Sequence, residues 1–179
     1  TAAAAAATVY ASFDRGERTV VGQRIVLSPT VRTLAPEGLS VVLRHELTHV
    51  ATRLDTAADA PMWLTEGLAE YVGRRGYRDF AAVAPDLTAA VRAGELPAGL
   101  PTDADFRVDT DEATLAYQSA WSFAAFVADV YGEPKLRAMY LATARGDAAA
   151  ASRSMNATLG KDQPELEKQW RSWLREQVD

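Results

Sequence analysis

Residues 45–49 read His45-Glu46-Leu47-Thr48-His49, the pattern H-E-x-x-H, and both histidines of the 179-residue chain lie in it. Positions i and i+4 of a helix share one face, so the two imidazole rings can reach a single metal ion. Glu46 lies about 100° around such a helix from His45, near the metal face but offset from it. From there it can hold a water molecule and take its proton. The pattern therefore predicts a metal site with a base beside it.

The sequence around this motif predicts one helix. After Pro36, apolar residues recur at helical spacing: Leu39, Val42, Leu43, Leu47, Val50 and Leu54. We therefore expect a helix from Glu37 to Leu54. Leu43, Leu47 and Val50 surround the motif, which predicts that the helix is largely buried. A buried imidazole or carboxylate needs a partner, and a metal ion supplies one.

A zinc ion bound by two histidines still lacks a protein ligand. The chain has no third His and no Cys, so a carboxylate must supply it. The next expected helix, Trp63 to Val72, carries Glu66 and Glu70 one turn apart on one face. We expect Glu66 to bind the metal and Glu70 to accept a hydrogen bond from a ligand histidine. The alternatives are the reverse assignment and a solvent-exposed Glu pair. Gly67 is expected to let this helix approach the first one closely.

Together the two motifs resemble those of the gluzincin metallopeptidases, the group that contains thermolysin and aminopeptidase N, and especially the peptidase MA-like domains. The matching residues are His45-Glu-x-x-His49 and Trp63-Leu-x-Glu66-Gly-x-Ala69-Glu-Tyr71. The resemblance implies a Zn²⁺ ion held by His45, His49 and Glu66, with Glu46 as the general base that lets a zinc-activated water hydrolyse a peptide bond. It also implies that Tyr117 stabilises the oxyanion, which a phenol can do. The alternative for Tyr117 is a core position with a satisfied hydroxyl.

Two departures from the family pattern bear on activity. His49 and Glu66 are 17 positions apart, slightly closer than in the family, so the loop from Asp55 to Pro61 must be tight. No Gly-x-Met-Glu-Asn motif precedes the helix, and in the aminopeptidases that motif binds the free amino terminus of the substrate. We therefore expect an endopeptidase in which a strand from Arg24 to Leu27 pairs with an extended substrate.

Two other functions fit the same sequence. One is a zinc-stabilised peptide- or protein-binding module that does not hydrolyse its ligand, because 179 residues leave little room for a separate substrate-binding domain. A protein that only holds zinc does not need Glu46, so the presence of this residue favours an enzyme over a binding module. The other, weaker alternative is a helical scaffold without a metal ion.

The flanking segments predict an α+β fold of zincin-like architecture, with a short N-terminal β-sheet followed by a mainly helical body. Segments Thr8 to Phe13 and Arg18 to Leu27 are rich in β-branched and aromatic residues and read as a hairpin with a turn at 14–17. Further helices are expected at Pro85–Ala93, Ala113–Tyr131, Lys135–Arg145 and after Asp162, where Asp162 and Glu165 have capping-box spacing. Between them, 94–111 is expected to be a loop. The acidic residues in and just after this loop, Asp103, Asp105, Asp109, Asp111 and Glu112, are interpreted as solvated, with a calcium site as the alternative.

The composition limits the class of protein. The chain is 48% hydrophobic and 24% charged, as in globular domains, and its net charge of −5 argues against a nucleic-acid partner. No window approaches the run of about 20 apolar residues that spans a membrane. The absence of Cys excludes disulfides and Cys-ligated zinc. The expected partner is a peptide or protein substrate, and the oligomeric state is not predicted.

The expected domain organisation is simple. Residues 8–179 show no internal repeat and no composition break, and are expected to form one zincin-like metallopeptidase domain. Residues 1–7 are mostly alanine and are interpreted as a linker or processing remnant. Of the two, we favour the stub left after export, which would place the protein outside the cell or at its surface.

Overall fold

The computed structural model describes residues 5–14, 16–107, 111–146 and 148–178. The N-terminal part holds β1 (Ala6–Val9), β2 (Ser12–Asp14), β3 (Thr19–Val21), β4 (Arg24–Leu27), the 3₁₀ turn η1 (Pro29–Thr33) and α1 (Pro36–Thr52). The rest holds η2 (Arg53–Asp55), α2 (Met62–Gly73), α3 (Phe80–Val83), α4 (Pro85–Arg92), η3 (Asp103–Phe106), α5 (Asp111–Tyr131), α6 (Glu133–Thr143), α7 (Ala148–Leu159) and α8 (Gln163–Val178). The predicted α+β class, a short sheet followed by a mainly helical body, is confirmed.

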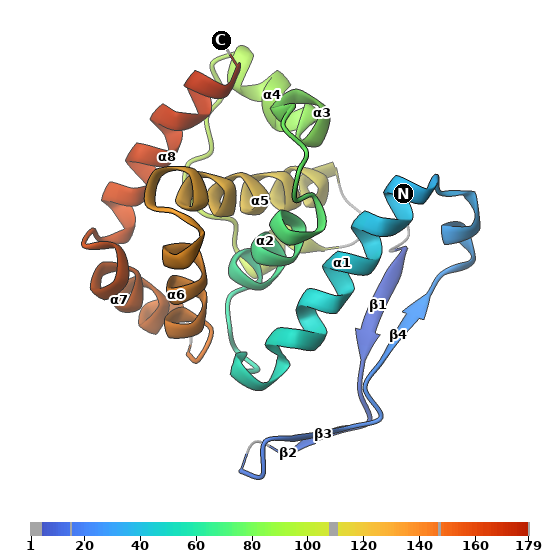
Figure 1. Cartoon of the computed structure of the whole chain (residues 1–179). Helices are drawn as coiled ribbons and strands as arrows, with labels where there is room; N and C mark the ends of the chain where they lie inside the picture. Colours follow the sequence, from blue (N-terminus) through green and yellow to red (C-terminus); the bar gives the residue numbers. More distant parts are fainter. Residues whose placement is uncertain (1–4, 15, 108–110, 147, 179) are drawn as a thin grey trace.

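The four strands form one long antiparallel hairpin. β2 pairs with β3, and β1 pairs with β4. The hairpin continues through the gap between the two ladders, where the N–H of Ala11 donates to the carbonyl of Val21 at 2.9 Å. The β2–β3 end extends away from the helices, and the β1–β4 end lies beside α1 (Figure 1). β1 begins at Ala6, two residues before the expected start at Thr8, whereas residues 1–4 lie outside the described part of the chain.

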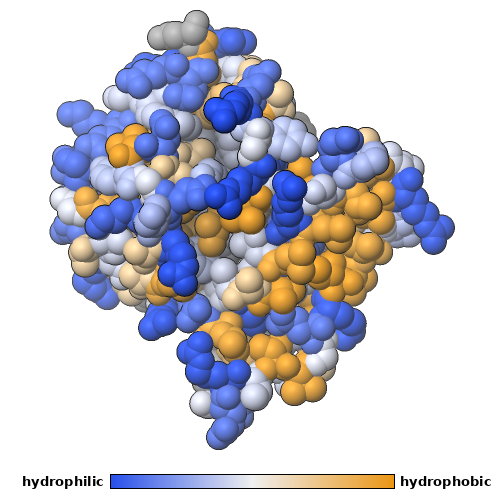
Figure 2. Space-filling view, in the orientation of Figure 1, coloured by the Kyte–Doolittle hydropathy of each residue, from blue (hydrophilic) through white to orange (hydrophobic). Residues whose placement is uncertain are grey.

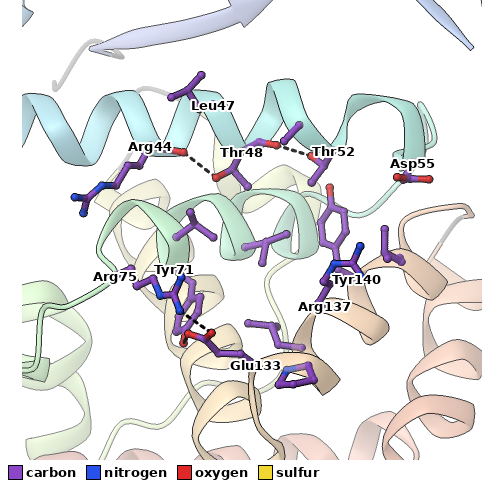
Figure 3. A pocket seen from close by; sticks show the side chains of 16 residues that line it. Arg44, Leu47, Thr48, Thr52, Asp55, Tyr71, Arg75, Glu133, Arg137 and Tyr140 are labelled. Atoms are coloured by element: carbon purple, nitrogen blue, oxygen red, sulfur yellow. Dashed lines mark hydrogen bonds and ion pairs between the residues drawn. The ribbon is translucent and has the colours of Figure 1, made fainter.

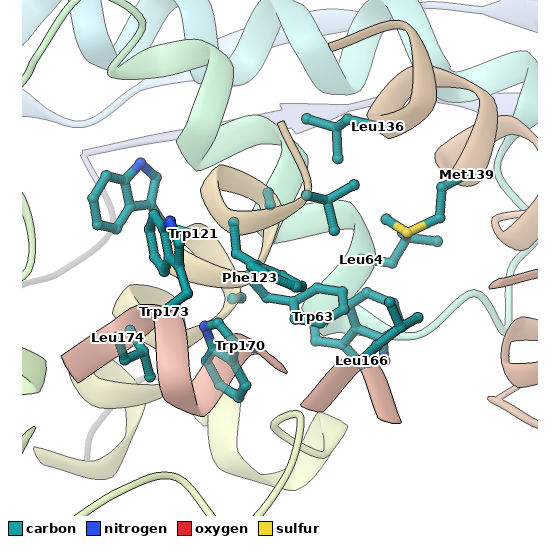
Figure 4. Packing of buried hydrophobic residues seen from close by; sticks show 14 of the residues in the cluster. Trp63, Leu64, Trp121, Phe123, Leu136, Met139, Leu166, Trp170, Trp173 and Leu174 are labelled. Carbon is teal, nitrogen blue, oxygen red and sulfur yellow. The ribbon is translucent and has the colours of Figure 1, made fainter. Parts of the chain in front are cut away.

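The core lies in the helical body. Aromatic side chains from three helices meet edge to face there: Trp63 of α2 lies 5.5 Å from Phe123 of α5, which lies 5.6 Å from Trp170 of α8, centroid to centroid (Figure 4). The buried indole N–H of Trp170 donates to the hydroxyl of Ser122 at 3.1 Å, so this polar group is satisfied. This core fixes α2 against α5 and thereby positions the acidic face of α2.

Helix α1 is much less buried than the sequence predicts. Among its residues only Glu46 and Thr48 are buried, and Leu47 is 54% exposed. The prediction was wrong because α1 packs against α2 on one side and β1 on another, and nothing in the described chain covers the remaining face. Figure 2 shows the result as apolar surface on the side of the molecule where α1 and the strands lie. No helix of the described chain is both long and apolar enough to cross a bilayer.

Candidate metal centre

His45 and His49 lie one turn apart on α1, and Glu66 of α2 faces both. The Nε2 atoms of the two imidazoles are 3.1 Å apart. One carboxylate oxygen of Glu66 lies 3.3 Å from Nε2 of His45, and the other lies 3.5 Å from Nε2 of His49. Within the described residues, this is the group of metal-binding side chains whose ligand atoms all lie within 4.8 Å of one another. The structure therefore brings together the three residues that the sequence singled out as metal ligands.

The chemistry and spacing of these donors fit a zinc ion. Zinc takes imidazole nitrogen and carboxylate oxygen at about 2.0–2.2 Å in a tetrahedral arrangement, which places ligand atoms about 3.3 Å apart. The two Nε2 atoms are 3.1 Å apart, and the Glu66 oxygens lie 3.3 and 3.5 Å from them, which matches this value. Three protein donors also leave one tetrahedral position for a water molecule or a substrate, the pattern of catalytic zinc sites.

The carboxylate of Glu66 is held in its charged form. Burial alone would raise its pKa, but hydrogen bonds and charges from His45 and His49 outweigh burial and lower the pKa from 4.5 to about 2. A carboxylate that stays ionised at neutral pH is ready to bind a cation.

Glu70 lies one turn further along α2 and contacts the other edge of the His45 ring. Its Oε1 is 3.3 Å from Nδ1 of His45, and its Oε2 pairs with Arg74. A proton on Nδ1 that is shared with Glu70 leaves the lone pair of Nε2 free for a metal ion. Glu70 thus lies at the Nδ1 edge of the His45 ring, whereas Glu66 faces the Nε2 atoms.

Glu46 is buried beside the cluster, with only 6% of its surface exposed. It is not part of the group of three ligands. Its Oε2 accepts a hydrogen bond from the hydroxyl of Thr8 in β1 at 2.6 Å. Thr8 could not be found from the sequence, because it lies 38 positions before Glu46 and no local pattern connects the two residues.

Tyr117 lies in the first half of α5, where its ring packs edge to face on Phe106 at 5.1 Å. Burial first, and then the negative charges of Glu66 and Glu46, raise the pKa of Tyr117 to about 12. The phenol therefore stays protonated at neutral pH.

A match to the peptidase MA superfamily spans residues 31–176. The chain belongs to the peptidase MA superfamily. Comparisons with curated proteins and with solved structures returned no match. Membership supports a metallopeptidase-like function and agrees with the His–His–Glu cluster.

The MA match begins after β4, so the whole hairpin precedes it. The likeness to this superfamily therefore covers α1, α2 and the helices behind them. Membership in the MA superfamily says nothing about Thr8 or about the other hairpin residues that contact α1.

Gly73, rather than Gly67, is the glycine that lets α2 approach α1 closely. A Cβ on Gly73 would lie 3.0 Å from the carbonyl oxygen of Val41 and 3.5 Å from Cβ of His45. A Cβ on Gly67 would instead lie 2.6 Å from the carbonyl oxygen of Ala120 in α5. The expectation for Gly67 was wrong because that residue faces the core side of α2, whereas the face with Glu66 and Glu70 turns toward α1.

The N-terminus of α2 and the loop before it are held by residues far along the chain. Asp103, in the acidic stretch, accepts a hydrogen bond from the backbone N–H of Met62 at 2.8 Å, while Asp109 lies outside the described residues. In the tight loop, the N–H of Ala57 donates to the carbonyl of Ala144 at 2.6 Å, and the hydroxyls of Thr56 and Tyr140 are 2.8 Å apart. These contacts fix Glu66 relative to the histidines.

Two hollows flank the α1–α2 pair. A cleft of about 350 Å³ is lined by His49 and Glu66 together with Thr8 and Tyr10 of the hairpin, so it opens directly on the cluster. A larger, mostly apolar groove of about 890 Å³ lies between α1, α2 and α6, and none of the three cluster residues lines it (Figure 3). A ligand in the smaller cleft would therefore lie next to the candidate metal centre.

Proposed function

We propose that this chain is a zinc-dependent peptidase that cleaves within polypeptides. The observation that carries the proposal is the convergence of His45, His49 and Glu66 on one point, with Glu46 buried beside them. Glu46 is the residue that distinguishes the enzyme from a binding module, since it lies outside the ligand group and a structural metal site does not need it.

A bound zinc ion would supply Lewis acidity, which polarises a substrate carbonyl and makes a water molecule more acidic. His45, His49 and Glu66 would hold the ion. Glu46 would take a proton from the attacking water and deliver it to the leaving amine nitrogen as the peptide bond breaks. Tyr117, which stays protonated, would donate a hydrogen bond to the oxygen on which negative charge develops.

The substrate would bind to the hairpin as an added strand. From sequence the expected strand is Arg24–Leu27, but β1 is the strand whose Thr8 contacts the helix of the H-E-x-x-H motif and lines the cleft. The pairing of Ala5 with Ser28 through the hydrogen bond from Ser28 N–H to Ala5 C=O sets the register. In that register Ala6 and Thr8 direct their backbone polar groups away from β4. An extended peptide can pair with this open edge.

The test is the Glu46→Gln variant, compared with the wild type and with Glu37→Gln in the exposed first turn of the same helix. Zinc content is measured by elemental analysis, and hydrolysis by digestion of a peptide library with and without a chelator. We expect Glu46→Gln to keep one zinc ion and to lose hydrolysis, while Glu37→Gln keeps both. A wild-type protein that binds zinc but cleaves no peptide would instead support the catalytically silent binding module. A wild-type protein without zinc would contradict both functions.

A further inference from the structure

We propose that Thr8 is a positioning residue that holds the carboxylate of Glu46 in place and links it to the strand on which substrate binds. The inference rests on the peptidase function proposed above and adds a residue to its site. Thr8 lies outside the segment that matches the MA superfamily, so the likeness does not assign it a role.

The contact between the two residues is short and directed at the carboxylate. Oγ1 of Thr8 lies 2.6 Å from Oε2 of Glu46 and 3.1 Å from its carbonyl oxygen. A hydroxyl has one proton to donate, and the shorter contact to a charged acceptor is the stronger one. The carbonyl oxygen also has a helical partner in α1. Thr8 therefore donates to the carboxylate.

This bond matters because Glu46 is buried. A buried carboxylate without donors would be costly, and an unrestrained one would sample several rotamers. Among the hydrogen bonds of the described chain, Thr8 supplies the side-chain donor to Glu46, and it engages Oε2. The bond fixes the plane of the carboxylate and leaves Oε1 to accept a proton. A base that is already held in one geometry loses less conformational entropy when the transition state forms.

The same residue is joined to the substrate side of the cleft. Thr8 pairs with Ile25 at a position where the β1 backbone points its N–H and C=O away from β4, toward the open edge. Its side chain meanwhile points to α1. A peptide that pairs with the backbone of Thr8 is therefore placed in fixed register with the base, so one residue sets the distance between scissile bond and Glu46.

The hairpin does not depend on Thr8 alone for its position. Gln23 donates to the carbonyl of Val50 at 3.4 Å, and the guanidinium of Arg53 lies 4.8 Å from the centre of the Tyr10 ring. Loss of the Thr8 hydroxyl therefore leaves two other contacts between hairpin and α1. This makes the role of the hydroxyl separable from a role in folding.

The experiment compares Thr8→Val, which keeps the shape and strand propensity but lacks the hydroxyl, with Thr8→Ser, which keeps the hydroxyl. Thr19→Val in β3 is the matched control at an exposed strand position. Each protein is assayed for zinc content, thermal unfolding, and kcat and KM on a peptide identified from the library. In addition, the ¹³C chemical shift of the Glu46 carboxylate is measured at one pH, with Glu46→Gln providing its assignment.

We expect Thr8→Val to keep zinc and KM while kcat falls about 10- to 100-fold, as when an outer hydrogen bond to a catalytic group is lost. Thr8→Ser should restore most of kcat, and Thr19→Val should match the wild type. The Glu46 carboxylate shift should move in Thr8→Val only. Because this shift is read without substrate, it tests the contact even if the wild type proves inactive and the proposed function fails. An unchanged shift, a kcat within about twofold of wild type, or a loss that Thr8→Ser does not rescue would overturn the proposal.

Discussion

Oε1 of Glu70 lies 3.3 Å from Nδ1 of His45, on the ring edge opposite the nitrogen that faces Glu66. The ring is thus contacted from two sides by carboxylates one helical turn apart. This arrangement fixes both the orientation of the imidazole and the nitrogen that carries the proton. Two acidic residues of similar appearance in the sequence are therefore expected to affect metal binding to different extents.

Removal of Glu70 should weaken zinc binding without abolishing it. We expect about a tenfold lower zinc affinity for Glu70→Gln, whose amide oxygen can still accept from Nδ1, and about a 100-fold lower affinity for Glu70→Leu. Glu66→Gln removes a charged ligand and should cost more than either. Competition with a chromophoric chelator measures all three, and Glu133→Gln, in an exposed ion pair with Arg75, is the control. Equal affinity in Glu70→Leu and wild type would remove Glu70 from the site.

The two glycines of α2 should respond differently to substitution. Gly67→Ala places a methyl group against the backbone of α5 and should lower the free energy of unfolding by about 1–3 kcal/mol. In Gly73→Ala the new methyl group would press on the backbone of Val41 and on the side chain of His45. This moves α2 away from α1, so the zinc affinity should fall as well. Gly38→Ala in α1 meets only ordinary contacts and should leave stability unchanged or raise it by about 0.5 kcal/mol. Urea unfolding and zinc titration check the three; undiminished zinc affinity in Gly73→Ala would contradict this reading.

Ser122→Ala should destabilise the helical core. The change leaves the buried indole N–H of Trp170 without an acceptor, which costs about 1–3 kcal/mol. Ser172→Ala on α8, where the hydroxyl is exposed and bonds its own helix, should stay within about 0.5 kcal/mol of wild type. Denaturant unfolding measures both, and a neutral Ser122→Ala would show that the indole finds another partner.

Tyr117 should contribute to loss of stability in alkali. Its pKa is about 12 in the folded protein and near 10 in an unfolded chain, so folding favours the neutral phenol. This contribution to stability is complete below about pH 10 and is lost as the pH rises toward 12. Phe cannot ionise, so the melting temperature of Tyr117→Phe should fall less steeply with pH across this interval than that of the wild type. Parallel curves would contradict the raised pKa.

The predictions from sequence succeeded where the pattern is local. The spacing of His45 and His49, and of Glu66 and Glu70, is a property of one helix each, and Gly132 with Pro134 marks the boundary between α5 and α6. Short α3 was missed because four residues carry no periodicity, and α7 because its many alanines distinguish its faces only weakly.

Contacts between distant segments could not be predicted in this way. Thr8 and Glu46, Asp103 and Met62, and Ala57 and Ala144 are joined only after the helices pack. The same limit explains the error about α1: its apolar spacing shows that it is a helix, but how much of that helix is covered depends on which neighbours reach it. Leu47 has the expected position on the helix, yet 54% of its surface stays exposed because the described chain covers it only in part.

Every described residue of the core cluster, and every partly buried apolar residue packed on it, has a number of 62 or higher. The hairpin and α1 therefore supply none of the described residues of this cluster, and we expect them to open first in native-state hydrogen exchange. A cation bound by residues of both α1 and α2 would hold the hairpin and α1 against the rest of the chain. Amides of α1 should then exchange much faster after chelation while those of α5 change little, and a chelated sample should be nicked in the N-terminal third by added protease.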